Sequence, residues 1–563
     1  MKTISHTEYP RPQLERDSYI NLNGEWNLTH LKPDLDSKEE FKIIVPFSPE
    51  SKASGLGHFI LQPKEQLVYD REFDLTADFI KDITLLHFGA VDYSCICSIN
   101  GKEVGSHKGG FLPFTFDISQ YLKIGKNEIK LTVTDPTDAG TQSRGKQKLK
   151  RGGIWYTPQS GIWQTVWLES VSKDFVKDIK ITPDIDSKSV EILVTTESPK
   201  ITIQVLDGKT VIAESNEKNA NINLPNMELW SPEHPKLYGI LIKTHGDTIK
   251  SYFGMRKFSI GFDGKFKRLF LNNKPYFHNG LLDQGYWSEG LLTPPNDDAM
   301  EKEIKLMKDM GFNMLRKHIK IEPLRWYYHC DRLGMLVWQD FVCGGGAYET
   351  WKVAYLPFIG WKTKDTKYKF LNRTDEAGRN EFISEMDRTV ALLKNTVSLS
   401  VWVLFNEGWG QFDSIQLTEK LRNLDNTRTI DSVSGWYDQG PNSSDLKSLH
   451  LYYQKLKVPK HESRVIVLSE FGGYSLKTEG HVFDEKKLFG YKILPDKQSL
   501  ENEYRNLFEK ELLPLLEKGL SASIYTQVSD VEEEINGLVT YDRKVIKFDI
   551  EFMRELNSKL VYK

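Results

Sequence analysis

The sequence has few cysteines and no pattern that would bring them together as metal ligands. Its 563 residues include only four, Cys95, Cys97, Cys330 and Cys343, and no CxxC motif. Cys95 and Cys97 lie two apart on a predicted strand, so they share a face without forming a ligand motif. No histidine-rich cluster accompanies them, which argues against a structural zinc site. We therefore expect free buried thiols, which fit a reducing compartment.

Long apolar runs and blocks of one charge are also missing. Nowhere do roughly 18 apolar residues follow one another, and residues 1–10 have no apolar core of the signal-peptide type. The 75 lysines and arginines nearly balance 78 acidic residues, which leaves a formal net charge of −3. This balance disfavours nucleic acid or an anionic membrane as a partner. We expect a cytoplasmic protein without a membrane partner.

What the chain does have is length and many aromatic side chains. Its length exceeds what one hydrophobic core accommodates, so we expect roughly two to four domains. Aromatic residues make up 12% of the chain, with 13 Trp and 24 Tyr. Such rings stack on the apolar faces of sugars, although packing in protein cores explains the same composition.

Short alternating strands separated by turn residues dominate the first part of the chain. Residues 1–172 contain strands such as 83–88, and Asn100-Gly101 is a hairpin signal. This pattern predicts a β-sandwich of the jelly-roll type. Residues 173–262 continue with a second set of short strands, which predicts an immunoglobulin-like sandwich without the usual disulfide.

Helical and strand patterns alternate from residue 263 onward. Residues 297–308 have a helical pattern, whereas residues 313–316, 336–338 and 401–405 are short apolar strands. Such alternation indicates βαβ units. Residues 263–563 are long enough for eight of them, so we predict a (β/α)8 TIM barrel as the third domain.

Two of these apolar strands end in a glutamate. Residues 400–405 lead into Asn406-Glu407, and residues 465–468 lead into Ser469-Glu470. Apolar runs of this length are typical of strands buried on both faces in a parallel sheet. The carboxyl ends of barrel strands meet at the mouth of the barrel, where catalytic groups collect. Two carboxylates facing one sugar are the machinery of glycoside hydrolysis.

Several segments form a recognisable series in order along nearly the whole chain: residues 11–17 (RPQLERD), 22–26, 153–158, 160–169, 253–256, 406–407 and 469–472. Together they resemble glycoside hydrolase family 2, which contains β-galactosidases, β-glucuronidases and β-mannosidases. The resemblance implies a jelly-roll sugar-binding domain over 1–172, an immunoglobulin-like domain over 173–262 and a catalytic barrel over 263–563. It implies a glycoside or oligosaccharide substrate and no cofactor or metal.

The resemblance also assigns roles at the barrel mouth. Glu407 is expected to be the general acid and base, and Glu470 the nucleophile that forms a covalent glycosyl-enzyme. Enzymes that retain anomeric configuration hold these carboxyls roughly 5–5.5 Å apart. Asn406 is expected to donate to the sugar 2-hydroxyl. Tyr452 is expected to hydrogen-bond the nucleophile, with Tyr453 as the alternative because the register of that strand is open.

Four more residues follow barrel strands and are candidates for substrate binding. Arg316 is expected to hold Glu470 ionised through a charge-assisted hydrogen bond, unless it pairs an internal acid. His318 and Asp340 are candidate ligands of sugar hydroxyls. Trp409 is either a platform for the sugar or part of the packing at the barrel rim.

Departures from the family pattern leave the sugar open. Family members usually carry a tryptophan at the end of the last barrel strand, where residues 523–530 offer only Tyr525 or Gln527. The Asn-x-Lys pair with which β-glucuronidases hold the uronate carboxylate is not seen after Glu470. The basic segment 146–151 is either a solvated loop or one that leans toward the active-site cleft.

The sequence thus predicts a retaining exo-β-glycosidase that hydrolyses terminal non-reducing sugars, with β-galactosidase as the leading activity. β-Glucuronidase, β-mannosidase and α-L-arabinopyranosidase are the alternatives within the family, and transfer to a sugar acceptor shares the same intermediate. A catalytically inactive carbohydrate-binding protein is the alternative from another class. Nothing in the sequence marks an interface, so a homo-oligomer stays an open option.

Overall fold

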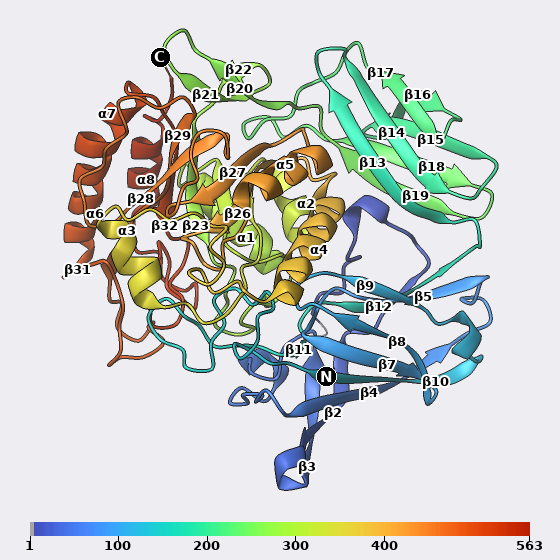
Figure 1. Ribbon diagram of the computed structural model, residues 1–563. Helices are drawn as coiled ribbons and strands as arrows, with labels where there is room; N and C mark the ends of the chain where they lie inside the picture. Colours follow the sequence, from blue (N-terminus) through green and yellow to red (C-terminus); the bar gives the residue numbers. More distant parts are fainter. Residues whose placement is uncertain (1–4, 563) are drawn as a thin grey trace.

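A sandwich of two antiparallel sheets forms the amino-terminal part of the computed structural model, which describes residues 5–562 (Figure 1). Alternate side chains such as Leu131 and Val133 are fully buried between the sheets. The period-two pattern of the sequence therefore becomes the core of the sandwich. One sheet contains β1 (Tyr19–Asn21), β12 (Val166–Val171), β5 (Ile83–Phe88) and β9 (Phe114–Asp117). The other contains β3 (Ser37–Val45), β2 (Gly24–Lys32), β4 (Gln66–Leu75), β10 (Gly125–Thr134), β7 (Ser94–Ile99) and β8 (Lys102–Lys108).

A smaller antiparallel sandwich follows, as predicted for an immunoglobulin-like fold. Its core is aliphatic, with Ile192 and Ile203 fully buried. Its first sheet contains β13 (Val176–Asp184), β14 (Ser189–Thr196) and β17 (Asn219–Asn223). Its second contains β16 (Thr210–Ser215), β15 (Ile201–Asp207), β18 (Tyr238–Thr244) and β19 (Thr248–Phe253). A small sheet of β20 (Phe258–Phe262), β21 (Lys267–Leu271) and β22 (Lys274–Pro275) leads into the third part.

Eight parallel strands form the third part, which confirms the predicted barrel class. The ladder is continuous except between its two end strands, β27 and β28, which meet where Asp445 N donates to Ile430 O at 3.1 Å. All residues of the two glutamate-bearing strands, β26 and β29, are buried, as expected for strands covered on both faces. In sheet order the strands are β27 (Thr429–Ser434), β26 (Leu399–Asn406), β25 (Leu336–Asp340), β24 (Met314–Lys317), β23 (His278–Asp283), β32 (Leu520–Thr526), β29 (Val465–Gly472) and β28 (Leu446–Leu451).

Helices cover the outside of the ring, although two connections lack one. Within residues 5–562, no helix joins β27 to β28 or β28 to β29. Several helices begin at a capping side chain: Asn296 accepts from Ala299 N at 2.8 Å, and Asp549 accepts from Phe552 N at 2.9 Å. The helices are α1 (Asp297–Asp309), α2 (Leu324–Leu333), α3 (Leu356–Phe358), α4 (Glu376–Leu393), α5 (Ser414–Leu424), α6 (Lys497–Asn506), α7 (Leu513–Leu516) and α8 (Ile550–Asn557).

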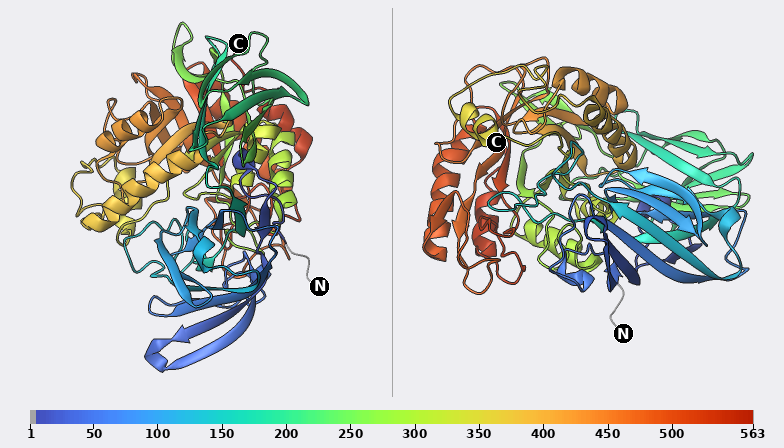
Figure 2. Two further views of the ribbon diagram at one scale, coloured as in Figure 1. Left: turned by 90° about the vertical axis from the view of Figure 1, so that its right-hand side faces the viewer. Right: turned by 60° about the horizontal axis from the view of Figure 1, so that its bottom comes forward.

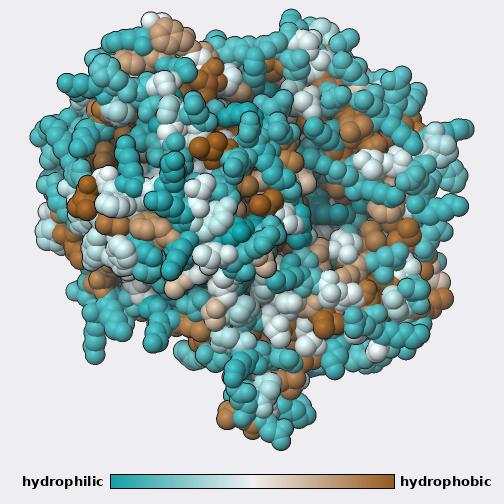
Figure 3. Space-filling model, viewed as in Figure 1, coloured by the Kyte–Doolittle hydropathy of each residue, from teal (hydrophilic) through white to brown (hydrophobic). Residues whose placement is uncertain are grey.

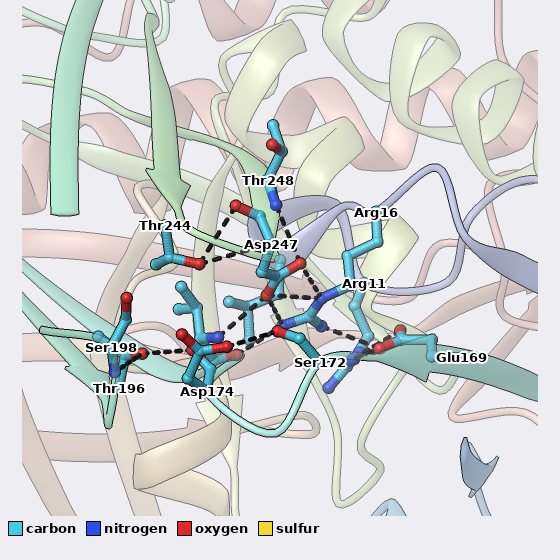
Figure 4. Close-up of polar contacts among 12 residues, drawn as sticks. Arg11, Arg16, Glu169, Ser172, Asp174, Thr196, Ser198, Thr244, Asp247 and Thr248 are labelled. Atoms are coloured by element: carbon cyan, nitrogen blue, oxygen red, sulfur yellow. Dashed lines mark hydrogen bonds and ion pairs between the residues drawn. The ribbon is translucent and has the colours of Figure 1, made fainter. Parts of the chain in front are cut away.

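The two sandwiches lie side by side against one flank of the barrel (Figures 1 and 2). A buried polar cluster joins them (Figure 4). The Arg16 guanidinium contacts Glu169 Oε2 and Asp247 Oδ2, both at 2.9 Å, and so links β12 of the first sandwich to the β18–β19 turn of the second. Arg11 binds both oxygens of Glu169, at 2.6 and 2.7 Å.

The surface is mostly hydrophilic on the face drawn in Figure 3, with apolar side chains scattered among polar ones. In the described part of the chain, helices are too short or too polar to span a bilayer.

Candidate active site

Glu407 and Glu470 come together at the carboxyl ends of β26 and β29. One oxygen of each carboxylate and a ring nitrogen of His450 all lie within 4.8 Å of one another. Glu407 has a left-handed backbone conformation, with φ of 49°, which is unusual for a residue with a side chain. Its N–H donates to Ser434 O at 2.9 Å, so the neighbouring strand β27 fixes this strained turn.

Glu470 is surrounded by groups that favour its ionised form. Arg316 Nη1 lies 3.3 Å from Glu470 Oε1, and the Tyr452 hydroxyl donates to Oε2. Tyr452 therefore contacts this carboxylate, whereas Tyr453 is 65% exposed and turns away. Burial opposes ionisation of Glu470, but the charges of His450 and Arg316 bring its pKa down to about 2.

The surroundings of Glu407, by contrast, favour its protonated form. Burial raises its pKa, and the nearby negative charge of Glu470 adds to this effect. A hydrogen bond with His450 partly opposes the rise: His450 Nδ1 lies 2.8 Å from Glu407 Oε1. Ser434 Oγ lies 2.9 Å from the other ring nitrogen, so His450 is held from both sides. The imidazole side chain is fully buried between the two carboxylates.

The Arg316 guanidinium contacts three of the other predicted residues. Besides Glu470, it donates to both oxygens of Asp340, at 2.9 and 3.0 Å, and to Asn406 Oδ1 at 2.8 Å. His318 Nδ1 lies 2.7 Å from Asp340 Oδ2, so Asp340 is already engaged by two protein groups. Burial lowers the pKa of His318 to about 4, which keeps this ring neutral. Asn406 Nδ2 is buried and has no partner among the described residues, so it is a free donor facing the site.

The remaining predicted residues are buried and contact other side chains. Trp409 is buried in an aromatic group, with its ring centroid 5.3 Å from that of Trp155. Tyr525 is also buried, and it packs outward against Phe471 in the layer between strands and helices. Gln527 is fully buried after β32, and its Nε2 donates to Asn536 Oδ1 at 2.7 Å.

The structure adds residues that the sequence did not indicate. One of them is His450, which contacts both carboxylates. Tyr491 stacks on Tyr452 with ring centroids 4.0 Å apart. Burial and the charges of Glu534, Glu407 and Glu470 raise the pKa of Tyr491. One of these residues, His450, could have been found from the sequence. It precedes Tyr452 by two residues, and side chains two apart on a strand lie on the same face.

Among the described residues, one group of histidines and carboxylates is close enough to share a metal ion. It consists of Glu407, His450 and Glu470. Their donor atoms are already engaged with one another and with Ser434, Arg316 and Tyr452. The arrangement suits proton transfer and nucleophilic attack by two carboxylates with opposed pKa shifts, which requires no metal.

Comparison with known proteins gives three consecutive matches to one family. Residues 58–169 match "Glycosyl hydrolases family 2, sugar binding domain", residues 173–256 match "Glycosyl hydrolases family 2", and residues 265–547 match "Glycosyl hydrolases family 2, TIM barrel domain".

Curated relatives and solved structures give the same family setting at low identity. The chain is 27% identical over 452 residues to a Formosa agariphila protein provisionally named a β-glucuronidase, covering 72% of this chain and 50% of that protein. It is 23% identical over 504 residues to a Thermoanaerobacter pseudethanolicus β-galactosidase, covering 82% and 62%. The chain thus spans roughly half the length of the curated relatives it matches. Its fold is similar to that of a Dictyoglomus thermophilum β-D-glucuronidase, with a TM-score of 0.78, 19% identity and coverage of 98% and 99%.

Proposed function

Because this chain belongs to glycosyl hydrolase family 2, we propose that it is a retaining exo-β-glycosidase, in which Glu407 is the acid and base and Glu470 the nucleophile. The observation that carries this proposal is the pair itself. The two carboxylate oxygens lie within 4.8 Å of each other, closer than the roughly 6.5–9.5 Å that separates the carboxyl groups of inverting enzymes. The opposed pKa shifts of Glu407 and Glu470 match the two roles.

In the first step, protonated Glu407 gives its proton to the glycosidic oxygen as the bond to the aglycone breaks. Ionised Glu470 attacks the anomeric carbon and forms a covalent ester. In the second step, Glu407, now ionised, takes a proton from water, which attacks the same carbon and releases the sugar. Two inversions leave the configuration unchanged.

Three neighbours support this chemistry. Arg316 and Tyr452 stabilise the charge of Glu470 before attack. The free Nδ2 of Asn406 is placed to donate to the sugar 2-hydroxyl, an interaction that strengthens at the transition state. Since Arg316 Nη2 donates to Asn406 Oδ1, the amide is oriented with its NH₂ group toward the substrate.

For the sugar, β-D-galactosides are the leading class, in line with the name of the Thermoanaerobacter relative. A β-glucuronide is the second candidate. The observation that favours it is an ammonium group, that of Lys146, which lies 5.8 Å from the centroid of the Trp409 ring, two residues beyond Glu407.

The test is hydrolysis of p-nitrophenyl β-galactoside, β-glucuronide, β-mannoside, β-glucoside and α-L-arabinopyranoside by the wild type, Glu470→Ala and Glu407→Ala. We expect one class to be cleaved with retention, as NMR of the first-formed anomer detects. Glu470→Ala should lose at least about 10⁴-fold, while azide should restore Glu407→Ala and give a β-glycosyl azide. Hydrolysis that survives Glu470→Ala contradicts the assignment.

A further inference from the structure

Tyr452, which donates to the carboxylate of Glu470, lies just beyond the end of its strand. β28 ends at Leu451, which pairs with Phe471 on β29, and Tyr452 is the next residue. Residues 452–464 then join β28 to β29 without a helix. Residues beyond the end of a strand are held less firmly than the strand itself, so side-chain contacts have to fix the direction of the Tyr452 hydroxyl.

Two further contacts hold the Tyr452 side chain. Thr526, at the end of β32, has its Oγ1 3.1 Å from the Tyr452 hydroxyl. Because the one proton of that hydroxyl is donated to Glu470, the Thr526 hydroxyl is the donor in this contact. The Tyr491 ring lies flat on the Tyr452 ring, with centroids 4.0 Å apart and an angle of 5° between the planes. Thr526 thus holds the hydroxyl end of Tyr452, and Tyr491 holds the plane of its ring.

The backbone on both sides of Tyr491 is hydrogen-bonded. Two residues before it, Phe489 N donates to Glu533 O at 2.7 Å. Directly after it begins β31 (Lys492–Leu494), which pairs with β30 (Tyr474–Leu476). A catalytic group is held accurately only when the residues that support it are themselves fixed. The Tyr491 ring meets this condition, because its own backbone determines where it lies.

Gly473 provides the space that the Tyr491 ring occupies. It follows Glu470 by three residues, its φ is 70°, and a Cβ at this position would lie 2.4 Å from Tyr491 Cδ2. Both the left-handed backbone and the close approach of the ring require glycine here. The chain directly after Glu470 is therefore shaped to admit the Tyr491 ring.

We propose that Tyr491 is a positioning residue for the nucleophile: by stacking on Tyr452, it keeps the Tyr452 hydroxyl directed at Glu470. This inference rests on the proposed glycosidase function and adds a residue to its machinery. Without the Tyr491 ring, the Tyr452 side chain is free to turn about its χ1 and χ2 bonds, and its hydrogen bond to Glu470 is lost. That bond helps to lower the pKa of Glu470, so its loss narrows the pH range in which the nucleophile is ionised.

The test measures kcat and KM on the p-nitrophenyl glycoside that the wild type cleaves. Tyr491→Phe keeps the ring and should stay within about 3-fold of the wild-type kcat/KM, whereas Tyr491→Ala should lose about 30- to 300-fold, mostly in kcat. The acidic limb of the pH profile of kcat/KM should move to higher pH in Tyr491→Ala, because Glu470 must be ionised to attack. Tyr491→Leu gives the same readout if the alanine variant does not fold. The control is Phe483→Ala, whose ring is 38% exposed and packs near Tyr541, and it should match the wild type.

A double-mutant cycle separates positioning from a merely structural role. Tyr452→Phe leaves no hydroxyl to direct, so adding Tyr491→Ala to it should cost less than about 3-fold. An equal loss in both backgrounds would show that Tyr491 does not act through the Tyr452 hydroxyl, which overturns the inference. A loss in Tyr491→Phe as large as that in Tyr491→Ala overturns it as well, because the stacked ring is then not what matters.

Crystal structures of the wild type and Tyr491→Ala keep this inference apart from the glycosidase proposal. We expect the Tyr452 hydroxyl to lie beyond hydrogen-bonding distance of Glu470 in the variant. If the wild type cleaves no glycoside, the glycosidase proposal fails, and this displacement still establishes that Tyr491 positions Tyr452. If glycosides are cleaved and Tyr452 keeps its place in Tyr491→Ala, the glycosidase proposal stands and the positioning role is overturned.

Discussion

At the scale of single residues, the candidate active site is a group of buried charged side chains in which His450 lies between Glu407 and Glu470. His450 contacts Glu407 at 2.8 Å and reaches Glu470 at 3.5 Å, so one imidazole touches both carboxylates. Gly435 allows this approach, because a Cβ at that position would lie 2.7 Å from His450 Nδ1. His450 is therefore a positioning residue that tunes the proton affinity of both acids.

Replacing His450 tests this role. His450 lowers the pKa of both Glu407 and Glu470, so His450→Phe should raise both. The pH profile of kcat/KM should then move to higher pH on both limbs, and the maximum should fall about 10- to 100-fold. His450→Asn keeps a donor near Nδ1 and should shift the profile less. A profile that His450→Phe leaves in place would rule out the tuning role.

The sequence located some of this centre and missed the rest for a physical reason. Glu407 and Glu470 stand out because each is a charge that ends an apolar strand. His450 alternates with leucines and resembles any half-buried strand residue, and Lys146 resembles Lys150 in the same basic run. Only contacts between distant segments, such as His450 with Glu407 and the Lys146 ammonium with the Trp409 ring, distinguish them. The assigned catalytic roles remain predictions.

At the scale of elements, the segment between β10 and β12 lies over buried carboxyl groups. Gln147 Nε2 donates to Asp92 Oδ2 at 3.1 Å, and Ser160 Oγ donates to Glu50 Oε1 at 2.6 Å. Burial raises the pKa of Glu50, of Asp135 and of Glu385, each to about 7, and also raises that of Asp92. These acids are protonated in the native state at mildly acidic pH.

This cluster predicts a stability that falls as pH rises. Glu50 has an ordinary value of 4.5 and a native pKa of about 7, so the native state holds the proton more tightly. Its favourable contribution is present below about pH 4.5 and is lost as pH rises through 7. Glu50→Gln should therefore stabilise the protein at pH 8 by about 1–3 kcal/mol and have little effect at pH 5.

Thermal unfolding at both pH values measures the effect. The control is Glu25→Gln, at an exposed position on β2, which should change neither midpoint. Equal effects of Glu50→Gln at pH 5 and pH 8 would contradict a native pKa of about 7 for Glu50.

Elements were predicted more successfully than their connections. The class of each domain is confirmed. It could be predicted because apolar residues repeat in the sequence with the period of a strand or of a helix. The absence of helices between β27 and β29 was not predicted, since residues 435–445 and 452–464 carry no signal beyond short length and turn residues. The limits at 172 and 262 stay predictions.

At the scale of the whole molecule, the two sandwiches are joined by buried ionic contacts. Glu169 is fully buried, and the charges of Arg11 and Arg16, with a bond to His87, outweigh its burial and hold its pKa well below the ordinary value. Its contribution to stability is therefore present above about pH 4.5 and lost as pH falls, opposite in sign to that of Glu50.

Glu169→Gln should destabilise the junction, because it leaves the buried Arg11 and Arg16 without their shared anion. We expect a cost of about 3–5 kcal/mol at pH 7, measured by urea unfolding. The control is Glu197→Gln, which removes a 73% exposed partner of Lys177 and should cost less than about 1 kcal/mol. Similar values for the two variants would show that the junction does not depend on this carboxylate.

The segment between β10 and β12 also has a genetic consequence. Tyr156 and Thr157 contact Glu534 and Glu532 after the last barrel strand, and Arg144 contacts the loop after β25. The codons for this segment and those for the barrel loops that it contacts are therefore separated by the codons of the entire immunoglobulin-like domain. A recombination event that moved the barrel alone into another gene would remove these contacts, so we expect the barrel and the first sandwich to be inherited together.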